Sequence, residues 1–240
     1  MSNVRRHEPR TAMLKRKQTP QRQDKDWFMF SASLMLHVCS DYIAMRTLYQ
    51  LEPLTTAPTL LVLMLDVVEK SLKLHLAVQT KTQNALSEMS SNYGHNVESL
   101  RAACAKFSAV FDDPDVRAFT KDLNDRDGKL YQQLRYGSQP TTDGFSTALD
   151  TLLPVVDKVF VRSILLLPED SRKLLFFVSP LKSLLVRSKF DQTRNPGLIV
   201  HLLRVGNAQY EDLLRCCEQI EREHTELGAK LAVAQNHPAQ

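Results

Sequence analysis

The sequence predicts an all-α protein, an antiparallel up-down bundle of helices followed by a helical C-terminal extension. Glycine is scarce at 7 of 240 residues and aromatic residues make up only 7%, whereas leucine is abundant. Apolar residues recur at steps of three and four along several segments, which gathers them on one helical face. Proline, acidic residues and asparagine stand where some of these segments begin, as is typical of a first helical turn. Together these observations favour helices over sheets.

Five helical segments are expected in the first two thirds of the chain. Each combines an apolar stripe with a recognisable start, and the fifth contains Pro154, which should kink or restart it. The fourth should run towards Leu134. In chain order, the expected segments begin at Trp27 (ending near Pro53), Pro58, Tyr93, Asp112 and Thr142.

The last third is expected to hold short elements and one long helix. Apolar stretches at 174–178 and 181–186 are separated by Pro180. Asparagine, proline and glycine at 195–197 predict a loop. A final helix is expected to span about 208–234, because apolar residues recur there on one face.

Charge is distributed unevenly along the chain. Residues 1–26 and residues 160–204 each carry eight Lys or Arg against three Asp or Glu, whereas residues 205–240 carry three against six. The first segment has almost no apolar periodicity and is predicted to be a disordered basic tail. We therefore divide the chain into this tail, a helical bundle at 27–167 and a helical C-terminal extension at 168–240.

Several functional classes are excluded by what the sequence lacks. No apolar run reaches the roughly 18 residues of a membrane span, and the N-terminus is basic and polar, so we expect no membrane contact and a cytoplasmic location. Cys39, Cys104, Cys216 and Cys217 lack CxxC spacing, which predicts reduced structural thiols. No phosphate-loop, dinucleotide, metalloprotease or hydrolase motif occurs, so we expect no cofactor and no metal site.

Three segments share their order and spacing with a known family. Residues 65–73 (LDVVEKSLK) place a Glu-Lys pair in an apolar stripe and continue into Leu-Lys. Residues 93–100 (YGHNVESL) carry Gly-His-Asn before a hydrophobic residue at the start of a helix. Residues 131–137 (YQQLRYG) end a helix on Arg-Tyr. With these segments, residues 27–137 resemble the HEPN family, the higher eukaryotes and prokaryotes nucleotide-binding domain.

The resemblance implies a HEPN-like bundle that binds RNA or a nucleotide. It also implies a homodimer, because domains of this family commonly pair through their helices. We expect the ligand contacts to come from Lys129, Tyr131, Arg135 and Tyr136. Tyr131 and Arg135 are four residues apart, so they share a face if the helix is unbroken.

Many HEPN domains are metal-independent ribonucleases whose motif is an Arg and a His separated by four to six intervening residues. In that chemistry the His activates the RNA 2′-hydroxyl or protonates the leaving oxygen, and the Arg stabilises charge on the phosphate. No His follows Arg135 within that distance. We therefore expect a non-catalytic protein and assign no catalytic residue. One match elsewhere, Arg194-Asn195 followed by His201, leaves a metal-independent ribonuclease as an alternative.

A further alternative is a helical protein-interaction or scaffold module with no nucleic-acid role, in which the acidic last helix docks on a partner. The basic stretch from Arg162 to Arg204 interleaves cations with Phe176, Phe177 and Phe190. Such a stretch could follow a phosphate backbone and stack bases. We favour the other interpretation, in which the phenylalanines are core residues and the cations face water, because the short helices need these rings for burial.

Overall fold

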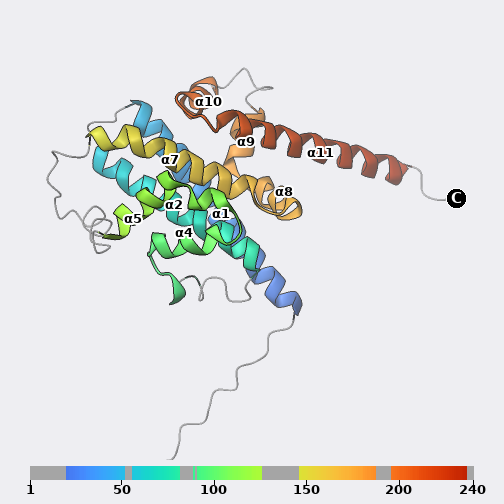
Figure 1. Ribbon diagram of the computed structural model, residues 1–240. Coiled ribbons are helices and arrows are strands. Elements are labelled where there is room, and N and C mark those ends of the chain that lie inside the picture. The colour runs from blue at the N-terminus through green and yellow to red at the C-terminus, as the bar shows by residue number, and fades with distance from the viewer. Residues whose placement is uncertain are drawn as a thin grey trace, which may run out of the picture.

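The computed structural model describes residues 20–51, 56–81, 89, 91–125, 146–187 and 196–236. Within these ranges every regular element is a helix, which confirms the predicted all-α class (Figure 1). The elements are α1 (Pro20–Leu51), α2 (Ala57–Thr80), α4 (Val97–Ala105), the short 3-10 helix η1 (Ala109–Asp112), α5 (Pro114–Asp125), α7 (Ser146–Leu165), α8 (Glu169–Phe177), α9 (Pro180–Arg187), α10 (Pro196–Arg204) and α11 (Tyr210–Asn236).

Local capping chemistry accounts for several helix starts. Pro58 lies in the first turn of α2, where its missing N–H costs nothing. The Asn96 side chain accepts a hydrogen bond of 2.9 Å from the Ser99 amide at the start of α4. The Asp113 carboxylate accepts one of 3.1 Å from the Asp115 amide in the first turn of α5. The starts expected near these residues are confirmed.

Three features differ from the expectation, and proline is involved in each. α1 begins at Pro20, earlier than the predicted start at Trp27. α7 continues through Pro154 without a restart, although this residue lacks the N–H for one helical hydrogen bond. Within the loop predicted at 195–197, Pro196 and Gly197 instead begin α10. Pro196 occupies the first position of that helix, where its fixed φ angle suits a first turn.

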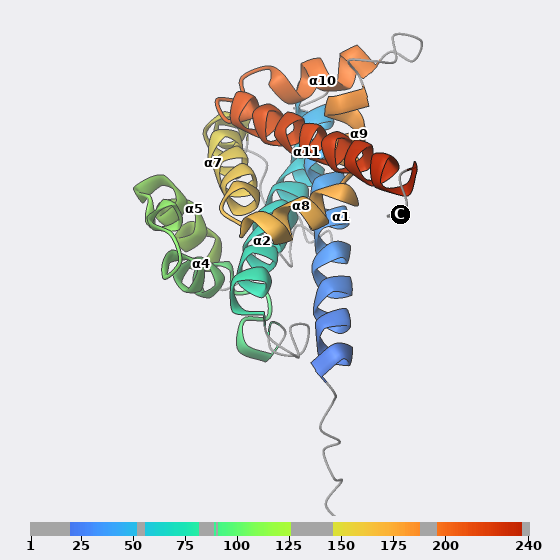
Figure 2. The ribbon, with the colours of Figure 1, turned by 90° about the vertical axis from the view of Figure 1, so that its right-hand side faces the viewer.

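Helix α2 lies at the centre of the bundle. Figure 2 shows α1 on one side of it and α4 and α5 on the other, and α7 also packs against it. The indole Nε1–H of Trp27, near the start of α1, donates 2.9 Å to the carbonyl of Ala77, near the end of α2. Burial around most of its circumference explains why α2 is the least polar of the long helices. Its buried residues include Leu60, Met64, Val68, Leu72, His75 and Val78.

The C-terminal helices share one hydrophobic core with the bundle. Phe176 of α8, Leu181 of α9 and Leu203 of α10 are buried in the cluster that also contains α1, α2 and α7 residues. α11 contributes Leu213, Cys217 and Ile220 from its first half. Its second half extends beyond the body of the molecule (Figure 1). The extension is thus held to the bundle by apolar burial and not only by its connecting segments.

Helix α1 contains a long apolar segment. Trp27–Leu51 is long and apolar enough to cross a membrane by length and composition, although the sequence was expected to contain no such run. The difference arises because Asp41 and Arg46 interrupt the run without making the segment as a whole polar. A core helix passes the same test, and α1 places residues such as Val38 and Met45 in the core. Core packing therefore accounts for part of its composition.

His75 provides a test of the buried core. Its ring is fully buried against Phe111, and Nδ1 lies 3.2 Å from the carbonyl of Ser163, which only accepts, so Nδ1 carries the hydrogen. Burial lowers the pKa of this imidazole, against the smaller opposing effect of the Ser163 carbonyl. Because this pKa is lower in the folded than in the unfolded state, the contribution of His75 to stability is complete above the unfolded pKa near 6.5. It is lost as the pH falls below that value.

We expect the wild-type protein to lose stability relative to His75→Gln as the pH falls from 7.5 to 5.5. Gln can donate to the same carbonyl but does not titrate. The difference in free energy of unfolding between the two proteins should change by at most about 1.4 kcal/mol for each pH unit in that window. Urea unfolding at several pH values measures it, with His201→Gln on the exposed face of α10 as the matched control. A difference that does not change with pH would show that His75 is not held neutral.

Candidate functional site

The predicted ligand contacts Lys129, Tyr131, Arg135 and Tyr136 lie outside the described residues, and so does Arg194. His201 is described, and its side chain is exposed on α10. The structure does describe the first two segments of the HEPN-like pattern, residues 65–73 and 93–100. We therefore build the candidate site from these segments.

The two segments meet at the carboxylate of Glu69. This side chain projects from α2 and is almost completely buried. Its Oε1 accepts 2.6 Å from Lys73 Nζ one turn along the helix, and both of its oxygens lie 3.1 Å from Nδ1 of His95. Because a carboxylate only accepts, the hydrogen-bond network assigns a hydrogen to Nδ1. A buried carboxylate needs such donors, so Glu69 ties the loop before α4 to α2.

A tight turn places His95 over α2. The amides of Tyr93 and Gly94 donate to the carbonyl of Met89 at 3.2 and 3.1 Å, and the amide of Asn96 donates 2.8 Å to the carbonyl of Tyr93. Gly94 has a φ angle of +53°, in the left-handed region that glycine adopts without steric cost. This turn therefore favours glycine at the position before the histidine.

The arrangement gives His95 a fixed orientation at an accessible place. Its side chain is 66% exposed, whereas the Glu69 and Lys73 side chains are 8% and 16% exposed. A carboxylate behind an imidazole fixes the ring orientation and favours one tautomer. Such a ring can donate a hydrogen bond to, or accept one from, a ligand at the surface. The Glu-Lys pair is thus a buried anchor for the histidine and not merely a solvated helical face.

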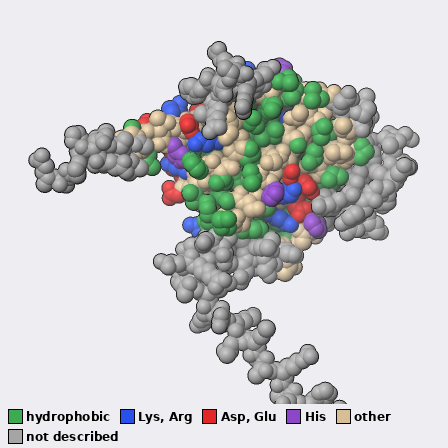
Figure 3. Space-filling model, turned by 180° about the vertical axis from the view of Figure 1, so that it is seen from behind, with side chains coloured by type: hydrophobic (Ala, Val, Ile, Leu, Met, Phe, Trp, Pro, Cys, Tyr) green, Lys and Arg blue, Asp and Glu red, His purple; other side chains and the backbone are tan. Residues whose placement is uncertain are grey.

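A second set of ions lies on the same stretch of α2. Lys70 Nζ contacts Asp41 of α1 at 2.5 Å and Asp66 of α2 at 3.2 Å. Burial by itself would lower the pKa of Lys70, but hydrogen bonds and charges from Asp41 and Asp66 raise it overall. Both lysines of this segment are therefore engaged by carboxylates. Figure 3 shows charged and histidine side chains gathered at two places on a face that is otherwise largely hydrophobic or neutral.

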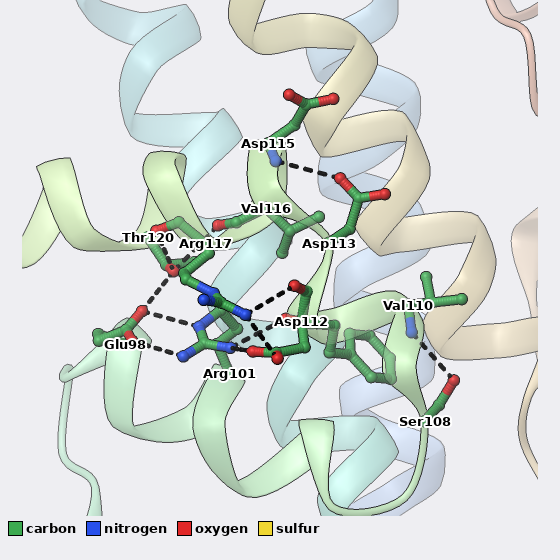
Figure 4. A network of polar contacts seen from close by, with 11 residues as sticks. Glu98, Arg101, Ser108, Val110, Asp112, Asp113, Asp115, Val116, Arg117 and Thr120 are labelled. Carbon is green, nitrogen blue, oxygen red and sulfur yellow. Dashed lines mark hydrogen bonds and ion pairs between the residues drawn. The ribbon is translucent and has the colours of Figure 1, made fainter.

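A polar network holds α4, η1 and α5 together (Figure 4). The Arg101 guanidinium donates to both oxygens of Glu98 at 2.9 and 2.6 Å, to the carbonyl of Phe111 at 3.1 Å and to Asp112 at 2.8 Å. The Thr120 hydroxyl donates 2.5 Å to Glu98. The hydrogen bond from Arg101 lowers the pKa of Glu98, against the effect of burial.

This network fixes where α5 begins and how it is oriented. Arg117 of α5 contacts Asp112 at 2.6 Å, and Lys158 of α7 lies 3.3 Å from Asp113 and 3.6 Å from Asp115. α5 ends at Asp125, directly before the segment that carries the predicted ligand contacts.

A separate group of polar residues is buried between α1, α7 and the turn after α10. Arg46 Nη1 lies 3.2 Å from Asp157 Oδ2, and the Tyr42 hydroxyl donates 2.8 Å to Asp157 Oδ1. Arg46 Nη2 also donates to carbonyls at the end of α10, those of Leu203 at 3.2 Å and of Val205. Arg46, Tyr42 and Asp157 are almost fully buried. The group joins parts of the chain and offers no accessible atom to a ligand.

Burial raises the pKa of Asp157 to about 6, although the charge of Arg46 and the hydrogen bond from Tyr42 act to lower it. Because this value lies above that of an unfolded aspartate, protonation favours the folded state. The contribution of Asp157 to stability therefore grows as the pH falls through 6, opposite in sign to that of His75. Sequence reasoning missed this pair, although a charged residue inside each of two apolar helical stripes was the available signal.

Four described residues of the basic stretch at 160–204 form ion pairs with the acidic helix α11. Phe176 is buried as expected and Phe177 is exposed, whereas Phe190 lies outside the described residues. The favoured interpretation, cations facing water, is corrected for three of the basic residues, which are at most 35% exposed and pair with acidic side chains of α11. These ion pairs are Arg162–Asp212 (3.0 Å), Lys173–Glu223 (2.8 Å) and Lys182–Glu221 (2.8 Å). Arg204 lies 3.5 Å from Glu211, but its side chain is 67% exposed and does face water.

The four cysteines are free and buried. Burial raises the pKa of Cys39 and of Cys104 to about 12, so these thiols are poor nucleophiles at neutral pH. Among the residues that the structure describes, no group of three or more His, Cys, Asp or Glu side chains could hold a metal ion. No protein-family model, curated protein or solved structure matches the chain.

The buried ion pair of Arg46 and Asp157 can be tested by substitution. Arg46→Ala should leave Asp157 buried without its cation and should lower the free energy of unfolding by about 3–5 kcal/mol. The double variant Arg46→Met/Asp157→Leu should recover most of this loss, since it buries neither charge. Urea unfolding at pH 7.5 measures both variants. Equal destabilisation in the two would show that the loss comes from packing and not from an unpaired charge.

Proposed function

We propose that residues 27–137 form a HEPN-like helical bundle and that the chain binds RNA or a nucleotide without cleaving it, as a homodimer. The observation that carries this proposal is the contact between Glu69 and His95. It joins two of the three segments on which the resemblance to the HEPN family depends. We also propose a cytoplasmic location, which four free cysteines favour.

The contact supplies a physical reason for both sequence patterns. A glutamate inside the apolar stripe of α2 is costly to bury unless donors surround it. Lys73 provides one donor from the same helix, and the glycine-histidine turn provides the other. The two segments therefore serve one site, and their joint occurrence is better explained by a shared structure than by two unrelated solvated helix faces.

The third segment would supply the ligand contacts. Lys129 and Arg135 offer cations for phosphate groups, and Tyr131 and Tyr136 offer rings on which bases can stack. This segment follows α5, whose start is fixed by the Arg101 network. The basic stretch at 160–204 is a weaker candidate for the same role, because four of its cations are paired with α11.

RNA binding by the full chain is the direct test. We expect a labelled, mixed-sequence single-stranded RNA to bind in fluorescence anisotropy at low salt and to dissociate as salt is raised. Lys129→Ala/Arg135→Ala should weaken binding about tenfold or more. It should also reduce the slope of log affinity against log salt by about 0.7 for each phosphate group that the variant no longer neutralises. Lys121→Ala/Arg222→Ala removes the same charge from two exposed positions and should bind as wild type.

Absence of RNA and nucleotide affinity at low salt would refute this function. The protein-interaction module is the second candidate, and the projection of the second half of α11 beyond the body favours it (Figure 1). In that role the chain would dock on a partner through its C-terminal helices and would need no free cations.

The ribonuclease alternative has its own test. It requires Arg194 and His201, of which His201 is exposed on α10. We expect no cleavage of labelled RNA by the wild-type chain in the absence of divalent metal, and therefore no difference for His201→Ala. Cleavage that disappears in His201→Ala while RNA binding is kept would instead establish the ribonuclease.

A further inference from the structure

Three large apolar side chains are exposed at the end of α8, and a fourth is exposed on the neighbouring helix α11. Leu174, Phe177 and Val178 lie three and four residues apart at the end of α8, with Phe177 63% exposed. Leu227 of α11 is 57% exposed and follows His224 by three residues, on the same side of the helix. The His224 ring centroid is 5.6 Å from that of Phe177, which brings the two helices together at this place. We call these four residues the α8–α11 patch.

The patch is held in a defined shape. Lys182 Nζ of α9 lies 4.8 Å from the centroid of the Phe177 ring, and His224 packs against the same ring. Lys173, one turn before Phe177, bonds to Glu169 at 2.6 Å and to Glu223 at 2.8 Å. Aromatic side chains fixed in this way are the usual anchors of protein interfaces, because little side-chain freedom remains to be lost on binding.

Carboxylates form the more accessible part of the border. The Glu169 side chain is 60% exposed against 31% for its partner Lys173, and Glu221 is 37% exposed against 17% for Lys182. Asp170 beside Glu169 is also exposed. Arg172 donates 2.6 Å to the carbonyl of Leu165, so its guanidinium is already engaged within the chain. The border of the patch therefore presents the carboxylates of Glu169 and Glu221 more openly than the lysines that pair with them.

We propose that the α8–α11 patch docks a partner protein through a basic amphipathic segment, whose apolar side chains cover Phe177 and Leu227 and whose lysines or arginines face Glu169 and Glu221. Charge complementarity selects this partner, because a nucleic acid or an anionic membrane would bring phosphates to the carboxylates. The proposal is independent of RNA binding. Four exposed side chains suit a short segment and a contact at the small end of protein interfaces.

The probe is a labelled 14-residue peptide of leucine and lysine, with leucines at the i, i+3, i+4 and i+7 positions of a helix. Its companion has glutamate in place of every lysine. In fluorescence anisotropy with the full chain, the lysine peptide should bind at least tenfold more tightly than the glutamate peptide. Phe177→Ser and Leu227→Ser should each weaken the lysine peptide about tenfold, the effect of losing one anchor.

The matched control is Leu198→Ser on α10, which removes an equally large side chain that is 51% exposed elsewhere. It should bind the lysine peptide as wild type, and all three variants should keep the wild-type circular dichroism spectrum. Unchanged affinity in folded Phe177→Ser and Leu227→Ser would overturn the proposal. Equal binding of the glutamate peptide would also overturn it.

Direct binding separates the other possible occupants. If Phe177→Ser and Leu227→Ser weaken the binding of single-stranded RNA or of anionic vesicles to the full chain, the proposal is overturned in favour of a nucleic-acid or membrane surface. The Lys129→Ala/Arg135→Ala variant should bind the peptide as wild type. If the chain binds the peptide but not RNA, the proposed RNA-binding function has failed. If it binds RNA but not the peptide, the docking proposal has failed.

Discussion

The buried guanidinium of Arg46 determines how α1 packs against α7 and the end of α10. It extends from α1 to a carboxylate of α7 and to carbonyls at the end of α10. The Tyr42 hydroxyl, one turn away, donates a hydrogen bond to Asp157. It also accepts one of 2.8 Å from the side-chain Nδ2 of Asn207, in the turn before α11. A buried cation must have acceptors, so the end of α10 and the start of α11 have to meet α1 at this point.

The position of α11 in turn determines the electrostatics of the C-terminal half. By sequence, a basic stretch is followed by an acidic helix, and each by itself is a candidate binding surface. In the folded chain the two face one another, so Arg162 and Arg204 are balanced by Asp212 and Glu211. The remaining feature of this region is apolar, the α8–α11 patch. Its chemistry fits a protein partner better than a phosphate backbone.

Buried charges connect the helices that precede the predicted contact segment in the sequence. Glu69 and His95 join α2 to the turn before α4, and Arg101 joins α4 to η1 and α5. Each connection satisfies a buried charge with donors or acceptors from a neighbouring element. The proposed RNA contacts, between Lys129 and Tyr136, follow α5 in the sequence. RNA binding and partner docking would then use different elements of the molecule.

The sequence alone determined what depends on neighbours within one or two turns. The apolar periodicity predicted the helices, and proline and capping residues placed the starts near Pro58, Asn96 and Asp113, since capping involves only adjacent backbone groups. The same local reasoning wrongly predicted a loop at Pro196, because proline occurs both in loops and in the first turn of helices. The predicted contacts at 129–136 lie outside the described residues and stay predictions. Only the tertiary structure decided which charges meet, because Arg46 and Asp157 are 111 positions apart and their pairing depends on how the helices pack.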